Sequence, residues 1–151
     1  AVAKGTDLEA RGGMLLGSFL GGLALTLAGT TAVHALSYPL GKRNVPHGVA
    51  NGMLLPWILE YNLAVCREKM IKLVPYLHSN KQLTTAEEVV GFIKELLATL
   101  PVPKTLGEVG IGADLIPALA AEAMEQQRLL VNNPRKMDQT EAEVIYRKIL
   151  A

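Results

Sequence analysis

The sequence predicts an all-α domain built from about seven or eight helices. Apolar residues recur at intervals of three and four along most of the chain, and no segment of useful length alternates between apolar and polar residues as a half-buried strand does. The 151 residues are half hydrophobic but only 5% aromatic, so we expect a core of leucine, valine, isoleucine, alanine and methionine side chains. Residues 1–151 are therefore predicted to form one multi-helix, bundle-like domain.

The first helix is expected to follow a loose lead-in at residues 1–6. Asp7 is a suitable N-cap, because its carboxylate can accept a hydrogen bond from a free N–H group of the first turn. This helix should run to about Ala28 and break at residues 29–31. A short helix then resumes and stops at residues 39–41, which contain a proline and a glycine.

A second long helix should begin near Pro46, since proline is well tolerated in the first turn of a helix. We expect it to run to about Val65, with a kink at Pro56. Residues 68–78 are predicted to be a further amphipathic segment, and a polar turn follows at residues 79–82.

The next predicted helix begins with a capping box. The Thr85 hydroxyl can accept a hydrogen bond from the N–H of the third residue of the helix, and the Glu88 carboxylate can accept one from the Thr85 N–H. The apolar stripe that follows ends before the Pro-Val-Pro sequence at residues 101–103, because proline interrupts helical hydrogen bonding.

Two more helices are expected in the last third of the chain. Asp114 should cap a helix over about residues 115–130, with Pro117 in its first turn. Thr140 and Glu143 have the spacing of a second capping box and should open the last helix.

One long segment carries no formal charge. Residues 12–41 contain no aspartate, glutamate, lysine or arginine, and a run of this length could cross a bilayer or serve as a secretory signal. Gly13, Gly17 and Gly21 recur every four residues, a spacing that lets helices approach closely in membranes and in soluble cores alike. Composition alone leaves open a membrane span, a signal peptide and a buried helix.

The overall charge argues against a nucleic-acid partner. The chain has 15 basic and 14 acidic residues, so it lacks the positive field that nucleic-acid binding requires. Cys66 is the only cysteine, which excludes an intrachain disulfide framework and leaves it as a small buried hydrophobe by default. We therefore expect a cytoplasmic protein.

The three histidines are the main candidates for chemistry. His78 is expected at the end of an amphipathic helix, where a cation is stabilised by the helix C-terminus, and is interpreted as structural. His34 lies in an uncharged, apolar segment, so its imidazole needs a partner, which could be a carbonyl, a carboxylate or a metal ion. His47 lies between a proline and a glycine at a helix start, which is a rigid placement.

His34 and His47 flank a turn, so two helices can direct both imidazoles at one point. Two imidazoles suit zinc or ferrous iron, but two ligands make an incomplete site. The nearest acids, Glu9 and Glu60, lie on segments whose direction the sequence does not fix. His-Glu-x-x-His motifs, cysteine clusters, nucleophilic serine elbows and glycine-rich phosphate loops after a strand are all absent from the sequence. The residues alone therefore predict at most half of a metal site.

The stretch around these histidines closely resembles the iron-containing (group III) alcohol dehydrogenases. The resemblance rests on Gly-Thr-Thr-Ala-Val-His-Ala-Leu-Ser-Tyr-Pro-Leu-Gly at residues 29–41, Val-Pro-His-Gly-Val-Ala-Asn at residues 45–51 and Leu-Leu-Pro at residues 54–56. It extends over nearly the whole chain, through residues 7–11, 100–101, 106–110 and 132–135.

This resemblance implies a helical domain that follows an α/β domain for NAD(H) or NADP(H), with metal and substrate in the cleft between them. The metal of the family is usually held by one aspartate and three histidines, and His34 and His47 match the last two. The aspartate and the first histidine come from an upstream Asp-x-x-x-His helix. The chain therefore resembles the C-terminal part of a longer enzyme, without the dinucleotide-binding domain and the first part of the helical domain.

Tyr38 stands where many family members carry a further histidine close to the nicotinamide and the substrate. A spacing of four residues puts it on the same helix face as His34. As a catalytic residue, Tyr38 would position the substrate or relay a proton through its hydroxyl. The alternative is a packed tyrosine whose hydroxyl has a structural hydrogen-bond partner.

The activity that the resemblance implies is metal-assisted hydride transfer between an alcohol and an aldehyde or ketone. Fe²⁺ or Zn²⁺ would act as the Lewis acid, and the nicotinamide would carry the hydride. We expect the complete enzyme to be a cytoplasmic homo-oligomer with a small alcohol or aldehyde substrate and no membrane partner, and this chain alone to be inactive. The alternative is a catalytically inactive helical module retained for interaction or assembly.

The resemblance also changes the interpretation of the uncharged segment. Gly13, Gly17 and Gly21 become close-packing positions in a soluble domain rather than in a membrane. Without its partner domain, the chain is expected to expose an apolar, glycine-rich face and to self-associate.

Overall fold

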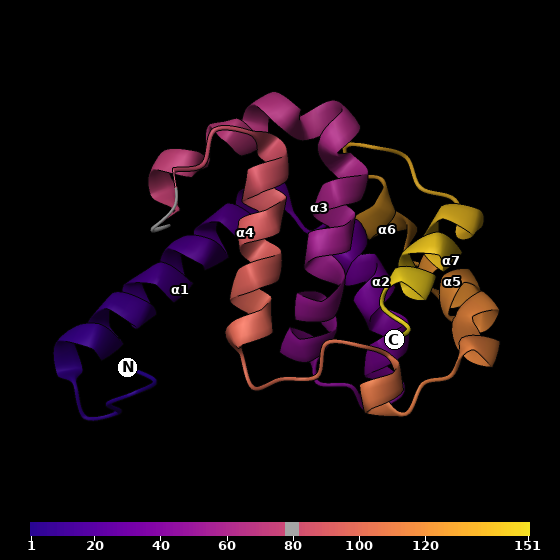
Figure 1. Ribbon diagram of the computed structural model, residues 1–151, viewed down its shortest axis with the longest axis horizontal. Helices are drawn as coiled ribbons and strands as arrows, with labels where there is room; N and C mark the ends of the chain where they lie inside the picture. Colours follow the sequence, from indigo (N-terminus) through magenta and orange to yellow (C-terminus); the bar gives the residue numbers. More distant parts are fainter. Residues whose placement is uncertain (78–81) are drawn as a thin grey trace. The chain divides into compact units, whose positions relative to one another are not determined.

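The computed structural model describes residues 1–77 and 82–151, which form seven α-helices and three short 3-10 helices and include no β-strand (Figure 1). The predicted all-α fold is therefore confirmed. The chain divides into two compact units, residues 1–30 and residues 31–151, which are described separately. His78 and its expected role at a helix end lie outside the described residues.

The first unit consists mainly of helix α1, Leu8–Ala28. The predicted N-cap is confirmed, because Asp7 Oδ1 accepts a hydrogen bond of 3.0 Å from the Ala10 N–H. The helix ends at Gly29, whose N–H donates to the Leu25 carbonyl and whose φ of 70° favours glycine. α1 buries none of its residues, and no atom lies within 4 Å of a Cβ placed on its glycines, so the expected close packing of Gly13, Gly17 and Gly21 is not observed.

α1 is also the one described helix that is long and apolar enough to cross a membrane by length and composition. A single such helix near the start of a chain is weak evidence, because signal sequences and core helices of soluble proteins meet the same criterion.

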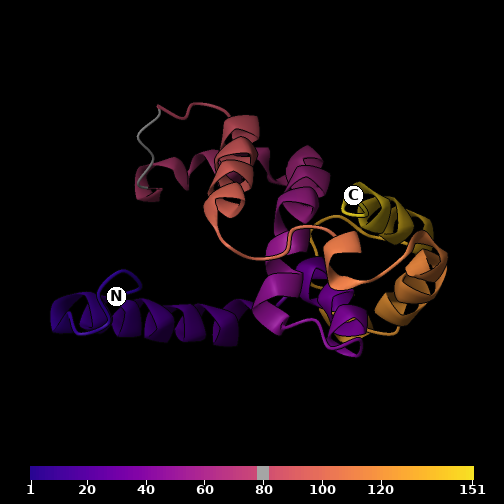
Figure 2. The same ribbon diagram turned by 60° about the horizontal axis from the view of Figure 1, so that its bottom comes forward.

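The second unit holds six α-helices. Their bounds are α2 Ala32–Gly41, α3 His47–Ile71, α4 Ala86–Thr99, α5 Ile116–Met124, α6 Gln127–Leu130 and α7 Gln139–Lys148. The 3-10 helices are Val74–Tyr76, Gly107–Val109 and Ala113–Leu115. α3 packs against α4 on one side and against α2 and α7 on the other, while α5 packs against α2 and α7 (Figures 1 and 2). The helix that begins with His47 therefore runs through the middle of this unit.

A core of aliphatic side chains holds these helices together, as the composition predicts. Its fully buried larger members are Leu36, Leu40, Met53, Leu54, Ile58, Leu106, Ile116, Leu119, Tyr146 and Ile149. Tyr146 is the one aromatic residue among them, and its hydroxyl donates a 2.6 Å hydrogen bond to the Leu36 carbonyl. This bond joins α7 to α2, and burial raises the pKa of the Tyr146 hydroxyl far above its usual value.

α3 is longer than the sequence predicts. The expected end near Val65 is wrong, because the helix continues past Pro56 to Ile71. Its last turns are stabilised by a second, smaller cluster in which Met70 packs with Ala86 and Val90 of α4. This contact joins segments that are distant in sequence, so local patterns did not reveal it.

Of the two predicted capping boxes, one is confirmed and the other is wrong. The box of Thr85 and Glu88 is confirmed, and the backbone N–H groups bonded to Glu88 lower its pKa to about 2. The box predicted at Thr140 and Glu143 is wrong, because the structure forms it two residues earlier, with Asp138 and Glu141. An aspartate is an equally good N-cap, and the residue before Thr140 is already helical.

The helix predicted over residues 115–130 is also interrupted. Asp114 does not cap it, because it lies inside the 3-10 helix Ala113–Leu115. The continuous helix is replaced by α5 and α6, with Gln126 at φ −83° and ψ 48° between them. Pro117 does lie in the first turn of α5, as expected.

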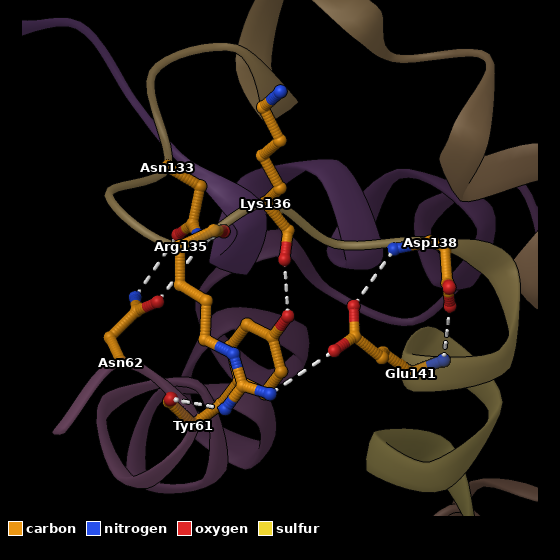
Figure 3. A network of polar contacts seen from close by, with 7 residues as sticks. All are labelled: Tyr61, Asn62, Asn133, Arg135, Lys136, Asp138 and Glu141. Atoms are coloured by element: carbon orange, nitrogen blue, oxygen red, sulfur yellow. Dashed lines mark hydrogen bonds and ion pairs between the residues drawn. The ribbon is translucent and has the colours of Figure 1, made fainter. Parts of the chain in front are cut away.

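The segment between α6 and α7 is fastened to α3 by a polar network (Figure 3). The buried amides of Asn62 and Asn133 exchange two hydrogen bonds of 3.0 and 2.9 Å. Arg135 lies 3.9 Å from the centre of the Tyr61 ring, donates to the Tyr61 carbonyl at 3.1 Å and pairs with Glu141 at 3.2 Å. Residues 132–135 therefore hold the loop between α6 and α7 against α3. This structural role explains their distinctive sequence.

Candidate metal centre

The two histidines are brought together by the short connection between α2 and α3. Residues 42–46 turn the chain, and Asn44 adopts a φ of 63°, a left-handed conformation that asparagine tolerates better than most residues. Pro46 occupies the N-cap position, one residue before the helix rather than inside its first turn. His47 is consequently the first residue of α3, while His34 lies in the first turn of α2.

Arg43 ties this connection to the rest of the unit. Its Nη1 donates to the Pro39 carbonyl at 2.9 Å, and its Nη2 lies 2.7 Å from Glu122 Oε1 on α5. Lys42 contributes a second ion pair to Glu122 at 3.2 Å. The pKa of the Glu122 carboxyl is lowered, mainly by the hydrogen bond from Arg43. The basic residues of the loop thus join the α2–α3 connection to α5.

The imidazole rings of His34 and His47 lie close together. Their centroids are 5.2 Å apart, and the ring planes are inclined at 56°. Two imidazoles that bind one ion at about 2.1 Å in a tetrahedral shell have centroids about 5 Å apart, so the observed separation fits a shared metal ion. The two side chains therefore have the chemistry and the spacing of two ligands.

Electrostatics keep His34 in the form that binds metals. Burial lowers the pKa of His34 below 6.5, and the neighbouring His47 lowers it further because two imidazolium cations repel each other. A metal ligand must be the neutral imidazole, so a lowered pKa leaves His34 available at neutral and mildly acidic pH.

Asn51 lies one turn after His47 and contacts it directly. Its Nδ2 donates to the His47 carbonyl at 2.8 Å and lies 3.1 Å from each ring nitrogen. Its Oδ1 is buried without a hydrogen-bond partner. Asn51 belongs to the quoted sequence motif, but sequence reasoning gave it no role.

Tyr38 lies one helical turn after His34. Tyr38 is 42% exposed in this chain. The hydroxyl oxygen lies 3.5 Å from Nη2 of Arg128, a residue of α6 that sequence reasoning did not single out. Arg128 is 90 positions away in sequence, and no local motif could have linked the two.

The described residues do not bring further metal-binding side chains to the histidine pair. Within residues 1–77 and 82–151, no group of three or more histidine, cysteine, aspartate or glutamate side chains is arranged to hold an ion. Glu60, one of the two acids nearest in sequence, is occupied elsewhere by 2.6 Å ion pairs with Lys94 and Lys148. A cavity of about 330 Å³ beside Glu60 contains neither histidine in its lining. The candidate centre therefore consists of His34 and His47.

The described residues thus form a helical domain in which two imidazole rings lie close together. A model of the Fe-containing alcohol dehydrogenase family, C-terminal, matches residues 1–150. The chain belongs to this family.

Similar proteins agree with that assignment. The chain is 35% identical to long-chain-alcohol dehydrogenase 1 of Geobacillus thermodenitrificans and 33% identical to 1,3-propanediol dehydrogenase of Klebsiella pneumoniae. These alignments cover 100% and 98% of the chain, but only 40% and 39% of the two relatives.

Solved structures give the same result. A crystal structure of 1,3-propanediol oxidoreductase superimposes with a TM-score of 0.90 at 31% identity, and an alcohol dehydrogenase from Oenococcus oeni with a TM-score of 0.89 at 29% identity. Each comparison covers 99% of this chain and 40% of the solved chain. The chain thus spans about two fifths of the length of these proteins.

Proposed function

We propose that this chain is the C-terminal helical domain of an NAD(P)-dependent alcohol dehydrogenase, and that His34 and His47 are two of the ligands of its catalytic metal. The single observation that carries the proposal is the 5.2 Å separation of the centroids of the two imidazole rings, which come from consecutive helices. Membership of the family supports the same conclusion. The remaining ligands, an aspartate and a histidine, would come from the sequence upstream of residue 1.

Bound Fe²⁺ or Zn²⁺ would supply a Lewis acid that polarises the carbonyl of an aldehyde or ketone and stabilises the corresponding alkoxide. His34 and His47 would bind as neutral imidazoles. Asn51 restrains the orientation of His47 through its contacts with the ring and the carbonyl of that residue. The residues of this chain therefore fix the ligand geometry before substrate arrives, which is the protein's main contribution in metal-assisted catalysis.

Tyr38 is proposed to act on the substrate side of the centre. Its hydroxyl is exposed and one turn away from His34, so it can donate a hydrogen bond to the oxygen of the substrate or relay its proton. Hydride would pass to or from NAD(H) or NADP(H), bound by a preceding α/β domain. The substrate would be a small alcohol or aldehyde, and the complete enzyme a cytoplasmic homo-oligomer.

The test uses the complete enzyme and this chain in parallel. The complete enzyme should reduce a short aldehyde with NADH or NADPH, and a chelator should abolish the activity. Because two ligands and no nucleotide site are expected here, residues 1–151 alone should give no turnover. Chelator-insensitive reduction by the complete enzyme would contradict the role of the metal, and turnover by residues 1–151 would contradict the division of the site.

The second candidate is an inactive helical module retained for interaction or assembly. It is favoured by one observation, namely that the described residues contribute two ligands rather than a full set. A complete protein that folds, but neither binds a metal nor reduces aldehydes, would support this alternative.

A further inference from the structure

Arg128 lies beside Tyr38 although the two are far apart in sequence. α6 presents the guanidinium so that Nη2 is 3.5 Å from the Tyr38 hydroxyl oxygen. That distance is at the long limit for a hydrogen bond, so the contact takes up little of the hydrogen-bonding capacity of the guanidinium. The arginine is exposed to solvent and keeps most of its five N–H donors available.

The other arginines of the second unit are used differently. Each forms an ion pair with a glutamate, in the pairs Arg43–Glu122, Arg67–Glu87, Arg135–Glu141 and Arg147–Glu143. In the part of the chain that the structure describes, Arg128 has no such carboxylate within ion-pair distance. It is therefore an uncompensated cation with a planar fork of donors, which is the geometry that binds carboxylate and other oxyanions in a bidentate manner.

The position of this cation relates it to the candidate centre. Tyr38 follows His34 by one turn of α2, or about 6 Å along the helix axis, and projects from the same face. Arg128 reaches that face from α6. A substrate whose carbonyl lies at the metal side of Tyr38 would extend its far end toward the guanidinium.

We infer that Arg128 is a specificity-determining residue that binds an anionic group, such as a carboxylate, at the end of the substrate distal to the reacting carbonyl. The inference rests on the proposed dehydrogenase function and narrows its substrate class to short aldehydes or alcohols that carry a negative charge. A neutral aldehyde leaves the guanidinium solvated and gains nothing from it.

The experiment compares two aldehydes with the same four-carbon chain in the complete enzyme. Succinic semialdehyde carries a terminal carboxylate, and butanal does not. The Arg128→Gln variant should lower the kcat/KM ratio of succinic semialdehyde to butanal by about tenfold or more, because hydrogen bonds to a charged group are worth about 1.5–3 kcal/mol. The change should be found mainly in KM for succinic semialdehyde, with butanal reduction unaltered. Arg128→Lys should retain part of the preference.

Arg147→Gln is the matched control. It removes another exposed arginine, which pairs with Glu143 on its own helix, and the ratio should not change. Butanal turnover by each variant verifies that the protein is folded.

Three results would overturn the inference. An unchanged ratio in Arg128→Gln would make Arg128 an ordinary surface charge. A raised KM for NADH or NADPH, with no change for succinic semialdehyde, would assign the guanidinium to a phosphate of the cofactor instead. If the unmodified enzyme reduces neither aldehyde, the proposed function fails and the inference with it. Reduction of butanal together with an unchanged ratio contradicts the role of Arg128 alone.

Discussion

His34 has the most distinctive environment of the residues in the candidate centre. It is half-buried and adjacent to a second imidazole, so both desolvation and charge repulsion disfavour its protonated form. The same two features make it a good metal ligand, because protons compete less for its lone pair.

The first prediction concerns the titration of His34. In residues 1–151, the pKa of His34 measured by NMR should lie below 6.5, and His47→Asn should raise it only in part, since burial is the larger cause. The folded chain binds fewer protons than the unfolded chain below pH 6.5, so this residue lowers the stability progressively as the pH falls from 6.5 toward its own pKa. A pKa at or above 6.5 in the unmodified chain would show that the ring is solvated and outside the pair.

Sequence reasoning at the residue scale found the ligand pair but not its neighbours. His34 and His47 flank a proline- and glycine-rich turn, and that local pattern was enough to predict their approach. Asn51 follows His47 by four residues on one helix, so its contact could have been anticipated from helical spacing. Arg128 was beyond reach, because its position depends on the packing of α6 beside α2.

At the scale of elements, the connection between α2 and α3 depends on the ion pair of Arg43 with Glu122. Both side chains are about three quarters shielded from solvent, with 25% and 24% exposed. The pair is partly buried and bidentate, and both features make it stronger than a typical surface ion pair.

We predict that Glu122→Gln lowers the free energy of unfolding by about 1 kcal/mol, measured by urea denaturation at pH 7. Because pairing lowers the pKa of Glu122, its stabilising contribution is present above pH 4.5 and is lost as the pH falls below that value. The nuclear Overhauser contact between the rings of His34 and His47 should weaken in the same variant. Glu143→Gln, which removes the ion pair to Arg147 four residues away, is the control and should leave that contact intact. A Glu122→Gln variant with unchanged stability and ring contacts would contradict the role of the loop pair.

The helix ends show which element boundaries can be predicted from local sequence and which cannot. Asp7 and the Thr85–Glu88 capping box act where the sequence predicts. The last helix offers two overlapping capping patterns, and the earlier one forms. The end of α3 depends on the contact of Met70 with α4, which is invisible to a local pattern.

At the scale of the whole molecule, α1 exposes more apolar surface than is usual for a domain that is stable by itself. Leu15 is 74% exposed and Phe19 is 62% exposed, and the helix carries further exposed leucines. A soluble monomer rarely leaves so much contiguous apolar surface uncovered.

Residues 1–151 in isolation are therefore predicted to self-associate. Sedimentation velocity should show a concentration-dependent shift to larger species, and the double variant Leu15→Gln with Phe19→Gln should reduce it. Val144→Gln is the control, because Val144 is a single exposed apolar residue on α7 and should have no effect. A single monomeric species for the unmodified chain at all concentrations would contradict this prediction, because it would show that the apolar surface of α1 does not drive association.

Membership of the family offers a reason why the sequence alone predicted only half of a metal site. The histidine pair was predictable as half of a site, while the other half was expected from an upstream segment and not from any residue in the chain. Among the described residues, no third histidine, cysteine, aspartate or glutamate side chain joins the pair.

The most direct test of the metal centre is the metal content of the complete enzyme and its histidine variants. Elemental analysis after purification should give about one Fe or Zn per chain in the unmodified enzyme, a large loss in His34→Ala and in His47→Ala, and no loss in His78→Ala, which removes the remaining histidine of the sequence. Undiminished metal in both His34→Ala and His47→Ala, with the protein still folded, would contradict the assignment of this pair as ligands.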